Sequence, residues 1–328
     1  MNKSSKAVAR SLATIGAIGA LVLSSVAFAQ AWPARPGRMV VPFPAGGPSD
    51  VLARVVSEKM SQAWGQQVIV DNRPGANTII GAEAVAKAAP DGYTLLMAID
   101  STLTMNQALY SKLPYDPMVD FAPISITAIS PVILVVDAAT GPKSVAELIQ
   151  HARSNPGKVT FGGGTVATQL AGESFKRLLD LNIVYVPYKG SPGTVQGLLS
   201  NDVTFIIDGV TSSVPHVRSG KFRVLASMSN RQIPALPGLP NINQTPGLSG
   251  YEFAVWLGLV ARAGTPADVI NRISQEFARI AALGDVREKY AASGLEPVSS
   301  TPAEFAAFIR REAERNIPVI RQAGIKLD

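Results

Sequence analysis

The 328-residue chain has no cysteine, only two histidines and few aromatic residues, which make up 6 % of it. The lack of cysteine excludes disulfides, zinc–thiolate centres and thiol catalysis, so the hydrophobic core alone must stabilise the fold. A hydrophobic fraction of 47 % in a chain of this length is enough for two domains. His151 and His216 have no paired nucleophile or acid beside them in the sequence. We interpret both as structural or surface residues and expect no metal site and no cofactor.

Basic clusters with interleaved aromatic residues are also missing, which argues against nucleic-acid binding. The one long apolar run, residues 12–28, follows Lys3, Lys6 and Arg10 and ends in Ala27-Phe28-Ala29. This pattern predicts a secretory signal peptide over residues 1–29 and a periplasmic protein; an uncleaved membrane anchor is the alternative. Residues 1–29 hold three basic residues and no acid, so cleavage would lower the net charge from +6 to +3.

Residues 40–50, Val-Val-Pro-Phe-Pro-Ala-Gly-Gly-Pro-Ser-Asp, predict a strand, a tight turn and the start of a helix. The helix is indicated by Leu52, Val55, Val56 and Met60 at three- and four-residue spacing, with Ser49 as the expected cap. The first N–H groups of a helix lack partners and favour an anion, and glycines in the turn permit close approach. The loop is therefore a candidate anion cradle, or else an ordinary strand-to-helix turn.

The same pattern recurs at residues 159–179, where a strand, the loop Gly162-Gly163-Gly164-Thr165-Val166-Ala167-Thr168 and an apolar-periodic helix follow one another. Alternating strands and helices predict parallel sheets covered by helices. The long apolar run 121–136 and the proline-rich segment 234–246 fit connections between two domains. We expect an α/β fold whose two domains, each with a mainly parallel sheet, face each other across a cleft, with ligand loops at the carboxyl ends of the strands.

Residues 162–167 also satisfy the G-x-G-x-x-A pattern of dinucleotide-binding loops. The next strand, however, ends in Val186-Pro187-Tyr188-Lys189 without the acid that would hold the ribose, so an NAD enzyme is disfavoured. A phosphate-binding loop and a G-x-S-x-G elbow are absent. Asp50 is either a first-turn helix acid or a ligand-orienting group, Lys189 is either a solvated lysine or a ligand contact, and Asp208 is taken as a ligand contact.

Six motifs together resemble those of the Bug-type periplasmic receptors, the solute-binding proteins of tripartite tricarboxylate transporters. Besides residues 40–50 they are Asn72-Arg73-Pro74-Gly75-Ala76, Ala89-Pro90-Asp91-Gly92-Tyr93-Thr94, Leu113-Pro114-Tyr115-Asp116, Val186-Pro187-Tyr188-Lys189-Gly190 and Gly264-Thr265-Pro266. The resemblance covers nearly the whole chain after residue 29. It implies a type II-like Venus-flytrap fold, with residues 30–128 and 229–328 in one domain and residues 129–228 in the other.

The resemblance further implies a small carboxylate ligand, delivery to the membrane components of a transporter or to a sensor protein, and a monomeric, non-enzymatic receptor. An exported hydrolase or oxidoreductase is the alternative from another class. The chain differs from the usual motifs of this family at two places, Pro48-Ser49 after the glycines and Asp100-Ser101-Thr102. Both differences bear on which carboxylic acid the receptor binds. Because the two glycine loops contain neither Arg nor Lys, we expect backbone N–H groups and hydroxyls to hold the carboxylate, with Lys189 adding less. The implied ligand set is Phe43, Ala45, Gly46, Gly47, Ser49, Asp50, Thr78, Ser101, Thr102, Gly163, Gly164, Thr165, Thr168, Lys189 and Asp208.

Overall fold

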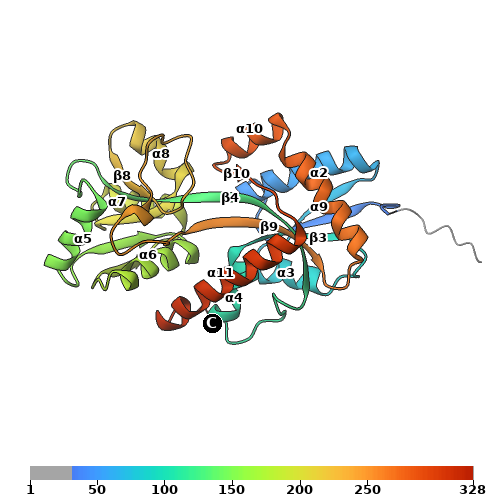
Figure 1. Cartoon of the computed structure of the whole chain (residues 1–328), viewed down its shortest axis with the longest axis horizontal. Helices are drawn as coiled ribbons and strands as arrows, with labels where there is room; N and C mark the ends of the chain where they lie inside the picture. Colours follow the sequence, from blue (N-terminus) through green and yellow to red (C-terminus); the bar gives the residue numbers. More distant parts are fainter. Residues whose placement is uncertain (1–31, 328) are drawn as a thin grey trace, which may run out of the picture.

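The computed structural model describes residues 32–327, which fold into two α/β lobes connected by two long strands (Figure 1). One path of hydrogen-bonded strands runs through both lobes in the order β2-β1-β3-β9-β4-β7-β5-β6, and β8 and β10 pair with β4 outside this path. No helix in this part of the chain is long and apolar enough to cross a membrane. The predicted signal peptide, residues 1–29, lies outside the described residues.

The first lobe is built on three parallel strands, β1 (Gly37–Val41), β2 (Val68–Asn72) and β3 (Thr94–Ile99). Between them lie the helices α2 (Pro48–Trp64) and α3 (Ile79–Ala86), and after β3 the chain makes a π-helical turn, η2 (Ser101–Met105), and the short α4 (Asn106–Leu109). Helices α9 (Ala267–Ala281) and α10 (Gly284–Ala292) return to this lobe from the C-terminal part of the chain. Apolar residues of α2 and α9 pack into one core with those of β1 and β3.

The second lobe repeats this arrangement with the parallel strands β5 (Thr160–Gly163), β6 (Val184–Pro187) and β7 (Phe205–Gly209). Its helices are α5 (Val145–Ser154), α6 (Val166–Leu178), α7 (Gly190–Leu199) and α8 (Val210–Arg218), and β8 (Phe222–Ser227) completes its sheet. The expected units of strand, glycine loop and helix are thus present in both lobes, as β1–α2 in the first and β5–α6 in the second.

Two strands carry the chain between the lobes, β4 (Phe121–Asp137) and β9 (Ala254–Arg262). β4 pairs with β9 up to Pro131 and with β7 and β8 from Val132 onward. Pro131 has no N–H to donate to a ladder, which suits it to the point where the partner strand changes. The short strand β10 (Glu296–Pro297) pairs with β4, and α11 (Pro302–Gln322) lies along the crossing strands.

The crossing strands make each complete sheet mixed, although its strands with βα connections are parallel as expected. β9 is antiparallel to β3 and to β4, and β4 is antiparallel to β7 and β8. β4 leaves the first lobe and β9 returns to it, so the two strands run in opposite directions. The sequence pattern of either lobe alone does not reveal these antiparallel pairs.

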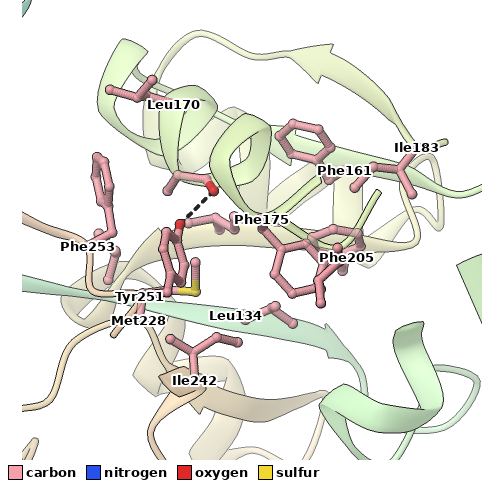
Figure 2. Packing of buried hydrophobic residues seen from close by; sticks show 14 of the residues in the cluster. Leu134, Phe161, Leu170, Phe175, Ile183, Phe205, Met228, Ile242, Tyr251 and Phe253 are labelled. Carbon is pink, nitrogen blue, oxygen red and sulfur yellow. Dashed lines mark hydrogen bonds between the residues drawn. The ribbon is translucent and has the colours of Figure 1, made fainter. Parts of the chain in front are cut away.

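A core of aromatic residues fixes the base of the glycine loop in the second lobe. Figure 2 shows Phe161 beside Phe205, with ring centroids 5.7 Å apart, and Phe175 against Phe205 at 6.2 Å. Tyr251 belongs to the segment that returns to the first lobe, which also contains the 3-10 turn η3 (Ile242–Gln244). Its buried hydroxyl donates a 2.7 Å hydrogen bond to the carbonyl of Ala171 in α6. The returning segment is therefore attached to the second lobe before β9 begins.

Candidate functional site

The loop between β1 and α2 ends in a helix that begins two residues earlier than expected. Gly47 occupies the cap position in extended conformation, Pro48 is the first helical residue, and no side chain caps the helix. The predicted cap at Ser49 is therefore wrong. Proline is favoured at the first helical position because its φ is preset and it has no N–H to satisfy. The N–H groups of Ser49 and Asp50 then belong to the first turn, ahead of the first intrahelical bond from Val51 to Gly47.

Asp50 holds this loop in shape with both of its carboxylate oxygens. Oδ2 accepts hydrogen bonds from the N–H of Gly46 at 2.8 Å and from Arg54 Nε at 2.9 Å, and Oδ1 accepts one from Asn72 Nδ2 at 2.8 Å. Asn72 Nδ2 also donates to the carbonyl of Phe43. Burial raises the pKa of the Asp50 carboxyl, but these hydrogen bonds outweigh it and lower the pKa below the ordinary value. Asp50 thus acts as the expected first-turn acid, and the N–H of Gly46 is already engaged.

The outer side of the same loop is open. Pro44, Ala45 and Gly46 are exposed, and Phe43 packs half-buried on the core of the first lobe. Gly46 has a φ of +87°, a backbone conformation that favours glycine. Gly47 has an ordinary φ, and a Cβ added to it would have the carbonyl oxygen of Pro44, 3.8 Å away, as its nearest neighbour. A side chain at Gly47 would therefore project into free space beside the helix N-terminus.

A second group of predicted residues meets at the end of β3. The hydroxyl of Thr102 donates to that of Thr78 at 2.8 Å, and Asn106 Nδ2 donates to the carbonyl of Asn77 at 2.9 Å. Residues 76–78 have positive φ in succession, at 46°, 45° and 77°, although none is glycine. Such strained backbone persists only where its surroundings over-determine it, and it concentrates at ligand sites. The expected polar loop at residues 100–102 is instead the start of the π-helical turn, a form that often occurs at functional sites.

Asp100 and Ser101 are buried at this turn with incomplete hydrogen bonding. Asp100 Oδ1 accepts from the N–H of Ser101 at 2.6 Å, whereas Asp100 Oδ2 and Ser101 Oγ have no hydrogen-bond partner among the described residues. Burial raises the pKa of the Asp100 carboxyl to about 7. Asp100 was not predicted as a ligand residue, and its strand-end position before Ser101 was the only signal that could have suggested it.

In the second lobe, the glycine loop leads into a capped helix. Thr165 Oγ1 accepts from the N–H of Thr168 at 3.2 Å, and Thr168 Oγ1 accepts from the N–H of Thr165 at 3.1 Å. This reciprocal capping box uses both hydroxyls and both N–H groups, although both threonines were predicted to bind ligand. The N–H groups of Val166 and Ala167 remain as first-turn donors. Val166 and Ala167 belong to the glycine loop whose backbone N–H groups were expected to hold the carboxylate, but the implied ligand set did not name them; the T-x-x-T spacing was the available signal.

Gly163 and Gly164 allow this loop to approach its neighbours closely. The carbonyl of Gly163 accepts from the N–H of Tyr188, and the carbonyl of Gly164 accepts from the N–H of Gly190. A Cβ on Gly164 would lie 2.4 Å from the carbonyl carbon of Gly190, and one on Gly163 would lie 2.8 Å from Thr168 Oγ1. These glycines are therefore required by packing, whatever else they contact. The contacts also place Lys189 next to the glycine loop.

Lys189 and Asp208 differ in how far they are free to bind a ligand. Lys189 is exposed, and no carboxylate of residues 32–327 forms an ion pair with it. Asp208 is buried and accepts from the hydroxyls of Ser191 and Ser212, both at 2.5 Å, and of Ser213 at 2.9 Å. Asp208 therefore fixes the first turns of α7 and α8, a function that three serines scattered over 22 positions did not reveal in the sequence.

Catalytic and metal-binding groups are not assembled in the described part of the chain. It contains no group of three or more His, Cys, Asp or Glu residues that could hold a metal. His151 lies near Asn155 in a helix end, and the ring of His216 packs on Phe222 at 5.0 Å. The candidate site therefore consists of two helix N-termini with unpaired N–H groups, one in each lobe, together with a few hydroxyl groups and the cation of Lys189. Among the described residues, no hydrogen bond or ion pair links the loop at residues 42–47 to the second lobe.

Comparison with known proteins identifies the family. The family model described as "Tripartite tricarboxylate transporter family receptor" matches residues 52–325. BugT of Bordetella pertussis is 34 % identical over 322 residues, which cover 97 % of this chain and 98 % of BugT.

Two solved structures from Rhodopseudomonas palustris extend the comparison to three dimensions. A protein solved with adipate is 33 % identical, with a TM-score of 0.75 over 90 % of this chain and 100 % of its own. MatC, solved with bound malate, is 28 % identical, with a TM-score of 0.71 over 88 % of this chain and 100 % of its own. The expected two-domain periplasmic-binding-protein fold is confirmed. This chain belongs to the tripartite tricarboxylate transporter receptor family, as a Bug-type receptor and not an enzyme.

Proposed function

We propose that this protein is exported to the periplasm, captures a small carboxylate between its two lobes and delivers it to the membrane components of a tripartite tricarboxylate transporter. The observation that carries the proposal is the similarity over nearly the whole chain to a receptor solved with adipate. Export is supported by the basic and apolar pattern of residues 1–29. The protein is expected to act as a monomer.

The proposed ligand groups are the loops that begin α2 and α6. On the first lobe these are residues 43–49 with Thr78, Ser101 and Thr102, and on the second lobe residues 163–168 with Lys189. Direct donors are the N–H groups of Ser49, Asp50, Val166 and Ala167. Asp50 and Asp208 position the loops, because their carboxylate oxygens already accept hydrogen bonds from the protein.

These groups can together account for micromolar affinity for a carboxylate. A helix N-terminus stabilises an anion by roughly 0.3–1 kcal/mol, or about 2 kcal/mol when partly buried. A hydrogen bond to a charged group contributes about 1.5–3 kcal/mol. Two such termini with several donors can supply the roughly 8 kcal/mol of micromolar binding after the cost of ordering and closure.

We propose that residues 30–128 and 254–328 move as one domain and residues 129–253 as the other. The change of strand partner at Pro131 supports the first boundary. The second boundary was expected at residue 229, but Ile233, Ile242 and Tyr251 pack in the cores of the second lobe, so we place this boundary at the start of β9. Closure about these crossings would bring the two helix N-termini onto one ligand.

The test is a binding experiment on the mature protein with adipate and malate, using adipamide as an uncharged control of the same chain length as adipate. We expect at least one acid to raise the melting temperature and to give saturable heat in calorimetry, with adipamide giving neither. Failure of a broad set of mono-, di- and tricarboxylates to bind would contradict the proposal. Uptake of the bound acid by vesicles that contain the membrane components, with and without the receptor, tests delivery.

A further inference from the structure

A hollow of about 550 Å³ is lined in part by residues of α10, β10 and α11. These three elements lie near the junction of the two lobes (Figure 1). The walls of the hollow come from α9, α10 and α11, from the crossing strand β4, and from Arg231, which follows the last strand of the second lobe. None of the predicted ligand residues lines it. We call this space the hinge hollow, and the inference drawn from it does not depend on the proposed function.

The floor of the hinge hollow is apolar and rigid. Ile126 and Ile129 of β4 and Phe305 of α11 are buried beneath it, and Phe308 is half-buried beside them. The ring of Trp256 packs behind both phenylalanines, with centroid distances of 5.8 and 5.2 Å. The apolar area still open to solvent belongs to the partly buried Pro297, Val298 and Phe308 above this floor, and covering it with a hydrocarbon would be favourable by about 25 cal/mol per Å².

The rim of the hinge hollow carries two guanidinium groups without an acidic partner. Arg287 projects from α10 and Arg311 from α11, and neither forms an ion pair with any carboxylate of residues 32–327. Arg311 lies instead over the ring of Phe308, at 5.9 Å from its centroid. A guanidinium stacked on an aromatic ring keeps its N–H edges free for a carboxylate.

The other charged groups at the rim are already engaged. Arg231 pairs with Glu296 of β10 at 2.6 Å. Glu304, the one acid in the lining, accepts hydrogen bonds from the N–H and the hydroxyl of Thr301, both at 2.8 Å. The unpaired arginines therefore leave the rim with an excess of positive charge above an apolar floor.

We propose that the hinge hollow is a second binding site, for an organic carboxylate with an apolar body about as long as octanoate. The hydrocarbon would cover the partly exposed Pro297, Val298 and Phe308, and the carboxylate would pair with Arg287 and Arg311. A volume of 550 Å³ lies within the range of small-molecule sites. Because Arg231 enters from the second lobe while α10 and α11 belong to the first, an occupant of this site contacts both sides of the hinge.

The test uses octanoate with the mature protein, both free and saturated with the acid that binds the cleft. We expect saturable binding in calorimetry in both states, and methyl NMR shifts at Ile126 and Ile129. Acetate lacks the apolar body and 1-octanol lacks the charge, so each should bind at least about tenfold more weakly. The double variant Arg287→Gln/Arg311→Gln should lose about tenfold or more in affinity for octanoate.

Matched controls separate this site from the cleft and from general effects of charge. Lys289→Gln on α10 and Arg310→Gln on α11 remove exposed cations that do not line the hollow, and should leave octanoate binding unchanged. Gly47→Asp changes the cleft loop and should also leave it unchanged. The proposal is overturned if octanoate does not bind at about 10 mM, if the cleft ligand displaces it, or if the double variant binds as well as the parent.

Discussion

At the scale of single residues, Asp100 is an acid whose charge the fold opposes. It is completely buried at the start of the π-helical turn, and one of its carboxylate oxygens has no hydrogen-bond partner in residues 32–327. Burial raises its pKa from 3.8 to about 7; the N–H of Ser101 and the charge of Arg315 lower it, and Glu312 raises it further. The folded protein therefore binds a proton here between about pH 4 and pH 7 that the unfolded chain releases.

The sign of the pH dependence follows from this difference. Where the folded state binds more protons than the unfolded state, stability falls as the pH rises. The stabilisation from protonated Asp100 is complete below about pH 4 and is lost as the pH rises through about 7. Asp100→Asn should remove this loss, and should be more stable than the parent at pH 8 by roughly 2–4 kcal/mol. Urea unfolding at pH 5 and pH 8 measures it.

Asp180→Asn is the control, because Asp180 is exposed and asparagine tolerates its positive φ. It should keep the pH dependence of the parent. A parent-like slope in Asp100→Asn would show that Asp100 is ionised in the folded protein at pH 5.

The acids also show how far residue roles could be predicted from sequence. The fold was read correctly at residues 40–50 and 159–168 because strand, glycine turn and helix are local patterns. The hydrogen bonds by which Asp50 and Asp208 fix the loops could not be predicted, since their partners Asn72, Ser191 and Ser213 come close only in the folded chain. Sequence analysis found the candidate loops, but not which of their polar groups the protein itself already uses.

At the scale of elements, two helices carry the same capping box in different places. Thr165 and Thr168 cap α6 beside the candidate site, whereas Thr301 and Glu304 cap α11 outside it. Replacing the capping threonine with alanine should cost about 1 kcal/mol of stability in either helix. Only Thr165→Ala should also weaken carboxylate binding, because it loosens the first turn that presents Val166 and Ala167.

Chemical unfolding and calorimetry on Thr165→Ala and Thr301→Ala test this pair directly. Equal affinities for the cleft ligand, together with similar losses of stability, would mean that the first turn of α6 does not contact the ligand. The π-helical turn after β3 is one of the elements that sequence analysis missed, because residues 101–105 have no periodicity that distinguishes it from a loop.

At the scale of the whole molecule, the two lobes touch between the start of α8 and the segment that follows α10. Thr211 stands in the first turn of α8 in the second lobe, and Gly294 follows α10 in the first. A Cβ added to Gly294 would lie 1.6 Å from Thr211 Oγ1 and 3.0 Å from Thr211 Cβ. A side chain at Gly294 would therefore force the lobes apart or displace Thr211.

Gly294→Ala should accordingly increase the radius of gyration in X-ray scattering of the ligand-bound protein and weaken ligand binding. Gly220→Ala is the matched control, because Gly220 has a similar φ of +73° but no atom within 4 Å of the added Cβ. In both variants, alanine at a positive φ lowers the stability of the folded protein by about 1 kcal/mol. Identical scattering from the two would show that this contact does not limit closure.

The central claim is that two helix N-termini, not a salt bridge, hold the carboxylate. The most direct measurement is calorimetric affinity for the best-bound acid in the parent, Gly47→Asp and Lys189→Ala. Gly47 is the better probe of the two glycine loops, because a side chain there meets free space, whereas one at Gly163 would clash with Thr168. Each variant should melt like the parent.

Gly47→Asp places a negative charge at the N-terminus of α2 and should abolish detectable binding, while Lys189→Ala should weaken it by about tenfold or less. The opposite ranking, with binding retained in Gly47→Asp and lost in Lys189→Ala, would show that a salt bridge holds the acid and would contradict this account.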